Sequence, residues 1–136
     1  MKKIAAAILG LFLSLSTLAH EWPHANISEA VFALNVEDRV PIDIVEEANN
    51  TLGKIYFFTN IRDLKGEYIT HRWIYDDNVM TNVRFEIRGS RWRVWSSKNL
   101  WPTWVGQWRV QVLLDDATML YESTFNYKKQ EVTENE

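Results

Sequence analysis

The feature that most constrains the fold is a tryptophan-rich segment, residues 70–109, which holds six of the seven tryptophans. Near its centre, Gly89 and Ser90 separate two stretches in which apolar and polar residues alternate. Alternation with a period of two is typical of a strand with one buried face, and glycine at the first position of a two-residue connection suits a type II′ turn. The pattern therefore predicts an antiparallel hairpin over residues 83–96. The side chains expected to point inward are Phe85 and Ile87 before the turn and Trp92 and Val94 after it.

The rest of the chain repeats this strand pattern at short intervals, with almost no helical periodicity. The expected strands cover residues 30–36, 54–60, 68–75, 79–88, 91–97, 108–114 and 119–127. Residues 38–50 contain a proline and several acids without a sustained period, so we interpret them as a long connection with one helical turn near Val45-Glu46-Glu47. About seven short strands predict an all-β protein with an immunoglobulin-like antiparallel β-sandwich. A small β-barrel is the alternative.

The first residues have the layout of a secretory signal peptide. Lys2 and Lys3 precede an apolar run from Ile4 to Leu15, and a small-residue cleavage motif ends at Ala19. We therefore expect export to the periplasm, cleavage after Ala19 and no stable membrane span in the processed chain; a retained anchor is the alternative. The expected organisation is a signal peptide (1–19), an N-terminal strand and long connection (20–53), a core β-domain (54–127) and a disordered polar tail (128–136).

Composition narrows the classes of function. The chain has no cysteine, which excludes disulfides, thiol nucleophiles and cysteine-ligated metal centres. With 15 basic and 18 acidic residues, removal of Lys2 and Lys3 leaves 13 and 18, a net charge of −5. Export and net acidity argue against a nucleic-acid partner, although interleaved arginine and tryptophan resemble a surface for single-stranded nucleic acid. No catalytic motif of a hydrolase, metalloprotease or nucleotide-binding enzyme is present, so we expect no enzyme and no cofactor.

Several strand motifs occur together in the second half of the chain. They are YFFTNI, HRWIY, FEIRGSRWRVWSSK and GQWRVQV, followed by a strand containing phenylalanine. In this combination the chain resembles a bacterial domain family of unknown function over residues 54–127. Members of that family are similar to periplasmic or membrane-associated modules, so the resemblance implies an envelope location and carries no activity. The pair Asp115-Asp116 stands where the family pattern leads us to expect glycine in the last hairpin.

The motif His71-Arg72-Trp73 allows two interpretations. On a strand, His71 and Trp73 point to one face and Arg72 to the other. Either Trp73 is a core aromatic with His71 hydrogen-bonded beside it, which we favour, or His71, Arg72 and Lys98 form a polar ligand site.

The loop from Lys98 to Gly106 is unusually aromatic, with Trp101 and Trp104 flanking Pro102-Thr103. Aromatic rings exposed on a rigid scaffold commonly hold sugars or peptides. Alternatively, both rings fold back and close one end of the sandwich. Arginines of the expected hairpin, Arg84, Arg88, Arg91 and Arg93, would offer bidentate contacts to an anion or would simply be solvated.

These observations lead to one principal prediction, an exported non-catalytic interaction module that binds an envelope protein or a glycan. The candidate ligand-binding residues are His71, Arg72, Arg93, Trp95, Lys98, Trp101 and Trp104. A first alternative is a periplasmic copper-binding accessory protein, because cleavage after Ala19 would give His20 a free amine beside its imidazole, with His24 nearby. A second alternative is a structural envelope domain without a small-molecule ligand.

Overall fold

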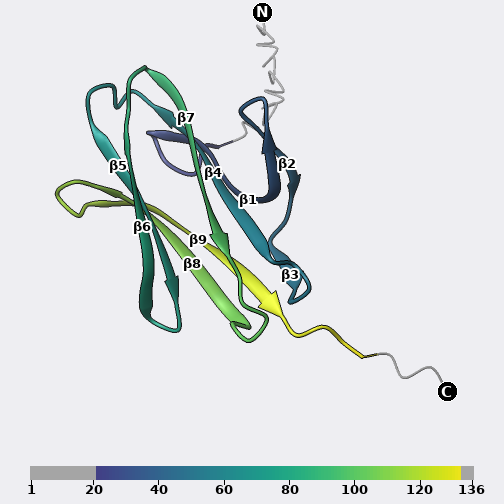
Figure 1. Cartoon of the computed structure of the whole chain (residues 1–136). Helices are drawn as coiled ribbons and strands as arrows, with labels where there is room; N and C mark the ends of the chain where they lie inside the picture. Colours follow the sequence, from purple (N-terminus) through teal and green to yellow (C-terminus); the bar gives the residue numbers. More distant parts are fainter. Residues whose placement is uncertain (1–20, 133–136) are drawn as a thin grey trace, which may run out of the picture.

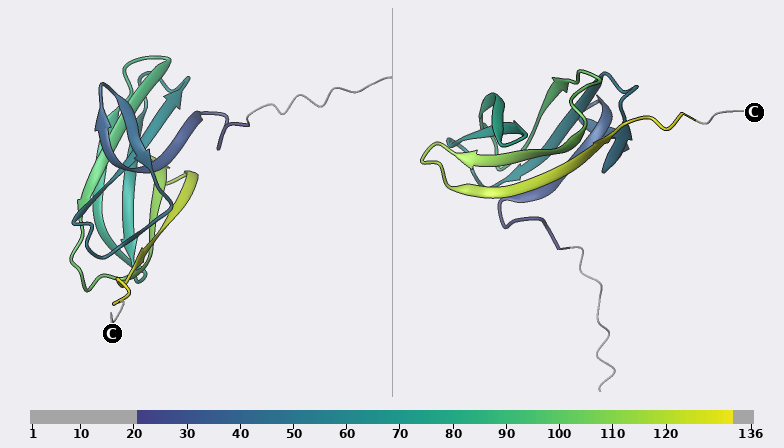
Figure 2. Two further views of the ribbon diagram at one scale, coloured as in Figure 1. Left: turned by 90° about the vertical axis from the view of Figure 1, so that its right-hand side faces the viewer. Right: turned by 90° about the horizontal axis from the view of Figure 1, so that it is seen from below.

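The protein folds as two β-sheets packed face to face. A computed structural model describes residues 21–132; the predicted signal peptide, His20 and residues 133–136 lie outside the described part. One sheet has the strand order β2-β1-β4-β7 and the other β3-β9-β8-β5-β6 (Figure 1; Figure 2 shows the two layers from the side and from below). The strands are β1 (Ile27–Glu37), β2 (Val40–Ile44), β3 (Glu47–Asn49), β4 (Lys54–Arg62), β5 (Tyr68–Tyr75), β6 (Asn78–Glu86), β7 (Arg91–Asn99), β8 (Gly106–Leu114) and β9 (Met119–Lys128).

This architecture confirms the predicted all-β sandwich, with nine strands in the described residues instead of about seven and with no barrel closure. Residues 21–132 contain no helix that could cross a membrane. The core lies between the sheets because alternate residues of the central strands point inward. Fully buried inward side chains include Phe57 of β4, Trp73 of β5, Trp108 and Val110 of β8, and Phe125 of β9. Trp73 is therefore the core aromatic that we favoured.

The predicted hairpin over residues 83–96 is wrong in its pairing. β6 pairs with β5 in one sheet, whereas β7 pairs with β4 in the other. Residues 87–90 thus connect the two layers, and their backbone bonds neighbouring loops: Ile87 N–H donates to the Glu67 carbonyl at 2.9 Å and Asp63 N–H to the Ser90 carbonyl at 2.8 Å. The inward face was nonetheless identified, since Ile87 and Val94 are buried and Phe85 and Trp92 pack against the core. The alternation of apolar and polar residues indicates which face of a strand is buried, but it does not indicate which strand pairs with it.

The prediction for residues 38–50 is also wrong, because this segment forms two strands and no helical turn. β2 pairs with β1 through a two-residue turn, in which Asp38 (φ 49°) and Arg39 (φ 60°) both adopt positive φ, as a type I′ hairpin turn requires. The chain then crosses to the other sheet, where β3 pairs in parallel with the end of β9, Glu47 opposite Asn126. β2 alternates at Val40, Ile42 and Ile44, but Pro41 argued against a strand; it is tolerated because β2 is an edge strand. The three residues of β3 are too few to show a period.

Candidate functional site

The motif His71-Arg72-Trp73 places a polar network inside the core. The hydroxyl oxygen Oγ1 of Thr59, in β4, lies 2.9 Å from His71 Nε2, and the same hydroxyl donates to the Val94 carbonyl at 3.1 Å. On the other side of the ring, Ser96 Oγ lies 2.8 Å from His71 Nδ1 and accepts from Trp73 Nε1 at 3.0 Å. Each hydroxyl has one proton, so Thr59 accepts from Nε2–H and Ser96 donates to an unprotonated Nδ1. All four side chains are satisfied with the imidazole neutral.

Burial keeps His71 in that neutral form. The ring is fully enclosed between the edges of Phe57 and Phe85, at centroid distances of 5.0 and 4.9 Å. This desolvation lowers the pKa of His71 from 6.5 to about 3. The network is closed to solvent, so His71 and Ser96 stabilise the core and do not present a surface for a ligand.

The aromatic loop, which we define as Leu100–Val105, is fixed by hydrogen bonds on several sides. Trp104 N–H donates to the Trp101 carbonyl at 2.9 Å, which closes a four-residue turn around Pro102. Asn50 Nδ2 donates to the Pro102 carbonyl at 3.1 Å, and Trp108 Nε1 donates to the Trp104 carbonyl at 3.0 Å. In addition, the Tyr75 hydroxyl donates to the Val105 carbonyl at 2.8 Å. The loop backbone is thus bonded to β5, to β8 and to the connection between β3 and β4.

The two tryptophans of this loop have different environments. Trp104 is half-buried against Tyr75 and Trp108, at ring-centroid distances of 6.4 and 5.8 Å, and covers one end of the core. Trp101 meets Trp104 edge to face at 6.2 Å and is 65% exposed. Lys98, at the end of β7, places its ammonium group 5.3 Å from the centre of the Trp104 ring, within cation–π range. One ring therefore closes the sandwich and the other is presented to solvent.

The structure separates the seven candidate ligand-binding residues into four places. Lys98, Trp101 and Trp104 lie together at the aromatic loop, and His71 is buried. Arg72 lies on the outer face of the other sheet, where its Nε donates to Asn82 Oδ1 at 3.0 Å. Arg93 and Trp95 line a separate pocket near the start of β7. The proposed grouping of His71, Arg72 and Lys98 in one polar site is therefore not present.

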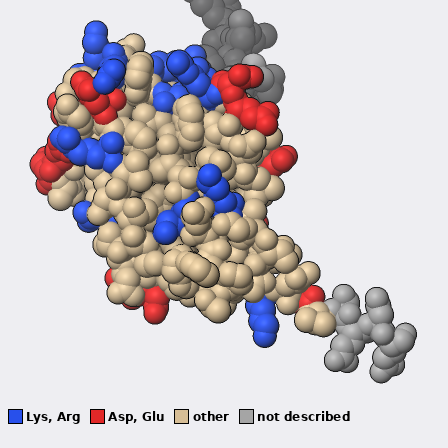
Figure 3. All heavy atoms as spheres, in the orientation of Figure 1, with Lys and Arg blue, Asp and Glu red and all other residues tan. Residues whose placement is uncertain are grey.

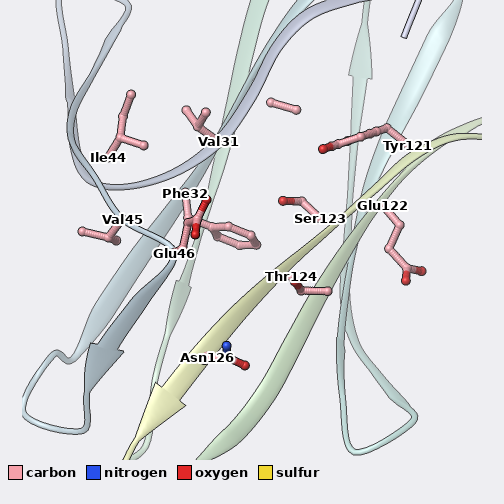
Figure 4. Close-up of a pocket in the computed structure, with 11 residues that line it drawn as sticks. Val31, Phe32, Ile44, Val45, Glu46, Tyr121, Glu122, Ser123, Thr124 and Asn126 are labelled. Carbon is pink, nitrogen blue, oxygen red and sulfur yellow. The ribbon is translucent and has the colours of Figure 1, made fainter. Parts of the chain in front are cut away.

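A groove between β1 and β9 has a volume of about 380 Å³, and the sequence did not reveal it. Figure 4 shows Phe32 within it, Tyr121 and Ser123 along β9, and the carboxyl groups of Glu46 and Glu122 on different sides. Gln111 and Arg109 bind Glu122 at 2.8 and 3.5 Å. The groove forms where β1 meets β9. Its lining residues Phe32 and Tyr121 are 89 positions apart in the sequence (121 − 32), so no local motif could predict it.

The charged side chains are unevenly distributed over the molecule. In the view of Figure 3, basic and acidic groups lie around the edge of the molecule, most of them in its upper part, while the face between them is uncharged apart from a central basic group. Within residues 21–132, no three His, Cys, Asp or Glu side chains come close enough to hold a metal ion. His24 Nδ1 accepts a hydrogen bond from Asn26 N–H at 3.0 Å. His20 lies outside the described residues, so the copper hypothesis stays a prediction.

The fold and these sites define a β-sandwich domain with an exposed aromatic loop. Residues 66–127, which run from the turn before β5 to the last residues of β9, match the sequence model of a family described as "Protein of unknown function (DUF2914)". The expected resemblance to a domain of unknown function is thus confirmed over this range, whereas residues 54–65, which we also included, lie outside the match. No curated protein matches the chain.

Proposed function

We propose that the chain is an exported, non-catalytic interaction module that binds an envelope protein or a glycan through its aromatic loop. The observation that carries this proposal is the 65% exposure of Trp101 on a loop whose backbone accepts hydrogen bonds from Asn50, Tyr75 and Trp108. Exposing a large apolar ring gains nothing for folding. An exposed ring on a loop backbone that hydrogen bonds already hold requires less ordering of the backbone when a ligand covers it, which favours binding.

The surroundings of Trp101 suit a ligand with an apolar face and polar edges. Trp104 supports the ring from one side at 6.2 Å, and Lys98 supplies three ammonium donors beside Trp104. The C–H face of a sugar ring or the aliphatic part of a partner's side chain would stack on Trp101, while Lys98 would bind a hydroxyl, carbonyl or carboxylate. Export is inferred from the Lys-rich start, apolar run and small-residue motif that end at Ala19.

The experiment is recovery of partners from the envelope by the processed protein, in parallel with a glycan-binding screen. The variant is Trp101→Ala, and the matched control is Trp22→Ala. Trp22 is also an exposed tryptophan (46%), but it lies over Arg62 at the opposite end of β4 from the aromatic loop. Both changes remove one exposed tryptophan ring, but only Trp101 belongs to the aromatic loop. Trp101→Ala should therefore abolish recovery of the partner, and Trp22→Ala should leave it unchanged.

The two arms of the experiment distinguish the classes of ligand. Retention of defined glycans identifies a glycan-binding module, and retention of a defined envelope protein identifies a protein-binding one. If both variants behave like the unchanged protein in both arms, the aromatic loop is not the binding surface. The alternative of a structural envelope domain would then be preferred.

A further inference from the structure

A second hollow contains arginine and tryptophan side chains and lies near the opposite end of β7 from the aromatic loop. We call it the arginine pocket; its lining residues are Arg39, Arg91, Trp92, Arg93 and Trp95, and its volume is about 280 Å³. Arg91, Arg93 and Trp95 alternate along β7, so all three point to the same, outer face of the sheet. β7 is an edge strand, which leaves this row open on one side.

The backbone of the neighbouring hairpin fixes the position of the pocket. Arg39 occupies the second position of the β1–β2 turn, and its carbonyl accepts a hydrogen bond from Arg93 Nη1 at 3.1 Å. Trp95 stacks on the buried Phe58 of β4, with ring centroids 6.3 Å apart and planes 19° from parallel. The guanidinium of Arg93 and the ring of Trp95 are thus held by contacts to other strands.

Arg39 is unusual at its position. Seven non-glycine residues of the described chain have positive φ: Asp38, Arg39, Asp43, Asp63, Asp76, Asp77 and Ala117. Aspartate tolerates this left-handed conformation because its short side chain bonds the local backbone, whereas arginine has no such compensation. Glycine is the residue preferred at the second position of a type I′ turn. The turn therefore has a cationic side chain at a position where the backbone conformation favours glycine, which has no side chain.

The arginines of the pocket also differ from three other arginines of this part of the chain, which are paired with carboxylates. Arg84 binds Asp115 at 2.6 Å, Arg88 binds Glu86 at 3.2 Å, and Arg109 binds Asp77 at 3.2 Å. In the described chain, the three arginines of the pocket form no ion pair with a carboxylate within 4.0 Å. Arg62 of β4 is the register partner of Arg91, but its guanidinium lies over Trp22 and donates to Ser28 Oγ at 3.1 Å, so it is not part of the pocket. Like charges held together in this way repel one another until an anion binds between them.

We propose that the arginine pocket binds a phosphate group. Guanidinium groups bind tetrahedral oxyanions through paired hydrogen bonds, and three of them match the charge of a dianion better than that of a single carboxylate. Trp95 provides an apolar wall for the body that carries the phosphate. The site is separate from the aromatic loop and does not depend on its function.

The direct test uses inorganic phosphate and the processed protein. Titration at pH 7.5 is followed by the indole N–H signals of Trp92 and Trp95 in NMR spectra, with acetate as the monoanion control. We expect saturable shifts with phosphate and at least tenfold weaker binding of acetate. Arg39→Gln and Arg91→Gln should each weaken phosphate binding about tenfold, as expected for loss of one charge-assisted hydrogen bond.

Matched variants separate a built site from general attraction. Arg72→Gln and Arg88→Gln remove the same unit of charge from exposed or partly exposed positions outside the pocket, and should weaken binding by less than about threefold. Thermal unfolding of all four variants checks that each is folded. Trp101→Ala should bind phosphate like the unchanged protein, so failure of the aromatic-loop proposal would leave this one standing.

A vesicle arm identifies the source of the phosphate group. Binding to vesicles of anionic phospholipid, but not to vesicles of neutral phosphatidylcholine, with the same loss in Arg39→Gln and Arg91→Gln, assigns a lipid headgroup. Phosphate binding without vesicle binding assigns a soluble phosphate compound. The proposal is overturned if phosphate does not saturate, if acetate binds equally well, or if all four arginine variants lose the same affinity.

Discussion

Two groups of tryptophan in this molecule have opposite relations to solvent. Trp73 is fully enclosed between the sheets and donates a hydrogen bond to Ser96, whereas Trp101 is 65% exposed on a fixed loop. Trp104 has an intermediate environment, because it contacts both the core and Trp101. The comparison shows that aromatic content by itself does not distinguish a core residue from a candidate binding residue. What distinguishes Trp73 from Trp101 is that Trp73 lies on the inward face of a strand, whereas Trp101 lies in a loop outside the strands.

The largest effect is expected for Trp73→Ala. Truncating this ring creates a large cavity and removes the N–H that Ser96 accepts, so the free energy of unfolding should fall by roughly 3–5 kcal/mol. Denaturant unfolding monitored by circular dichroism measures the change. A loss below about 1 kcal/mol would contradict the enclosed position of the ring and remove the basis of the comparison.

The second prediction concerns acid. The pKa of His71 is lowered to about 3 in the folded protein and is near 6.5 when the chain is unfolded. A lowered pKa means that the unfolded state takes up the proton first, so the stabilisation by neutral His71 is complete above pH 6.5 and is lost between pH 6.5 and about 3. The loss approaches roughly 1.4 kcal/mol per pH unit well inside this window.

The measurement for this prediction is the free energy of unfolding at pH 7 and pH 4.5. In His71→Phe the extra loss at pH 4.5 should disappear, whatever the stability of the variant at pH 7. His24→Phe is the control, because that histidine is only half-buried. If His71→Phe retains the full pH dependence, carboxylates and not His71 control acid unfolding.

Trp104→Ala should have an intermediate effect, about 1–3 kcal/mol, since the ring covers one end of the core while part of it contacts solvent. Loss of the Trp104 ring should also remove the edge-to-face contact with Trp101, so that the Trp101 side chain becomes more mobile. Near-ultraviolet circular dichroism would report this as a reduced tryptophan signal at unchanged secondary structure. An effect equal to that of Trp73→Ala would place Trp104 wholly with the core group.

Trp101→Ala should have the smallest effect on stability, within about 1 kcal/mol, as is usual for exposed side chains. A thermal melt beside the unchanged protein tests this directly. A loss of several kcal/mol would mean that Trp101 belongs to the core closure, and the distinction between the two groups of tryptophan would fail.

The alternation of apolar residues was sufficient to predict most strands and the sandwich. His71-Arg72-Trp73 was correctly placed on a strand. The break between the expected strands 68–75 and 79–88 is a hairpin turn, in which Asp76 and Asp77 both adopt the positive φ of type I′. Gly89-Ser90 has an equally convincing local pattern and nonetheless connects two sheets. Strand pairing depends on contacts distant in sequence, such as Phe58 with Trp95, and a local pattern contains no information about them.

The candidate sites were predicted only in part for the same reason. The aromatic loop is continuous in sequence, so Lys98, Trp101 and Trp104 could be grouped before their geometry was known. The arginine pocket combines β7 with a turn more than fifty residues earlier, at Arg39. Arg93 and Trp95 were identified as candidates, but their partner came from a segment interpreted as an irregular connection.

The parallel pairing of β3 with β9 has a consequence for how the chain reaches its folded state. Glu47 lies opposite Asn126, a separation of 79 residues (126 − 47), and this pairing joins the early part of the chain to its last strand. Closing so long a loop costs entropy before any contact repays it, and a high contact order slows folding. We therefore expect β3 to dock only after β9 has emerged and paired with β8. Until then the chain would remain a partly assembled intermediate, and the last folding step would be the pairing of three residues at the sheet edge.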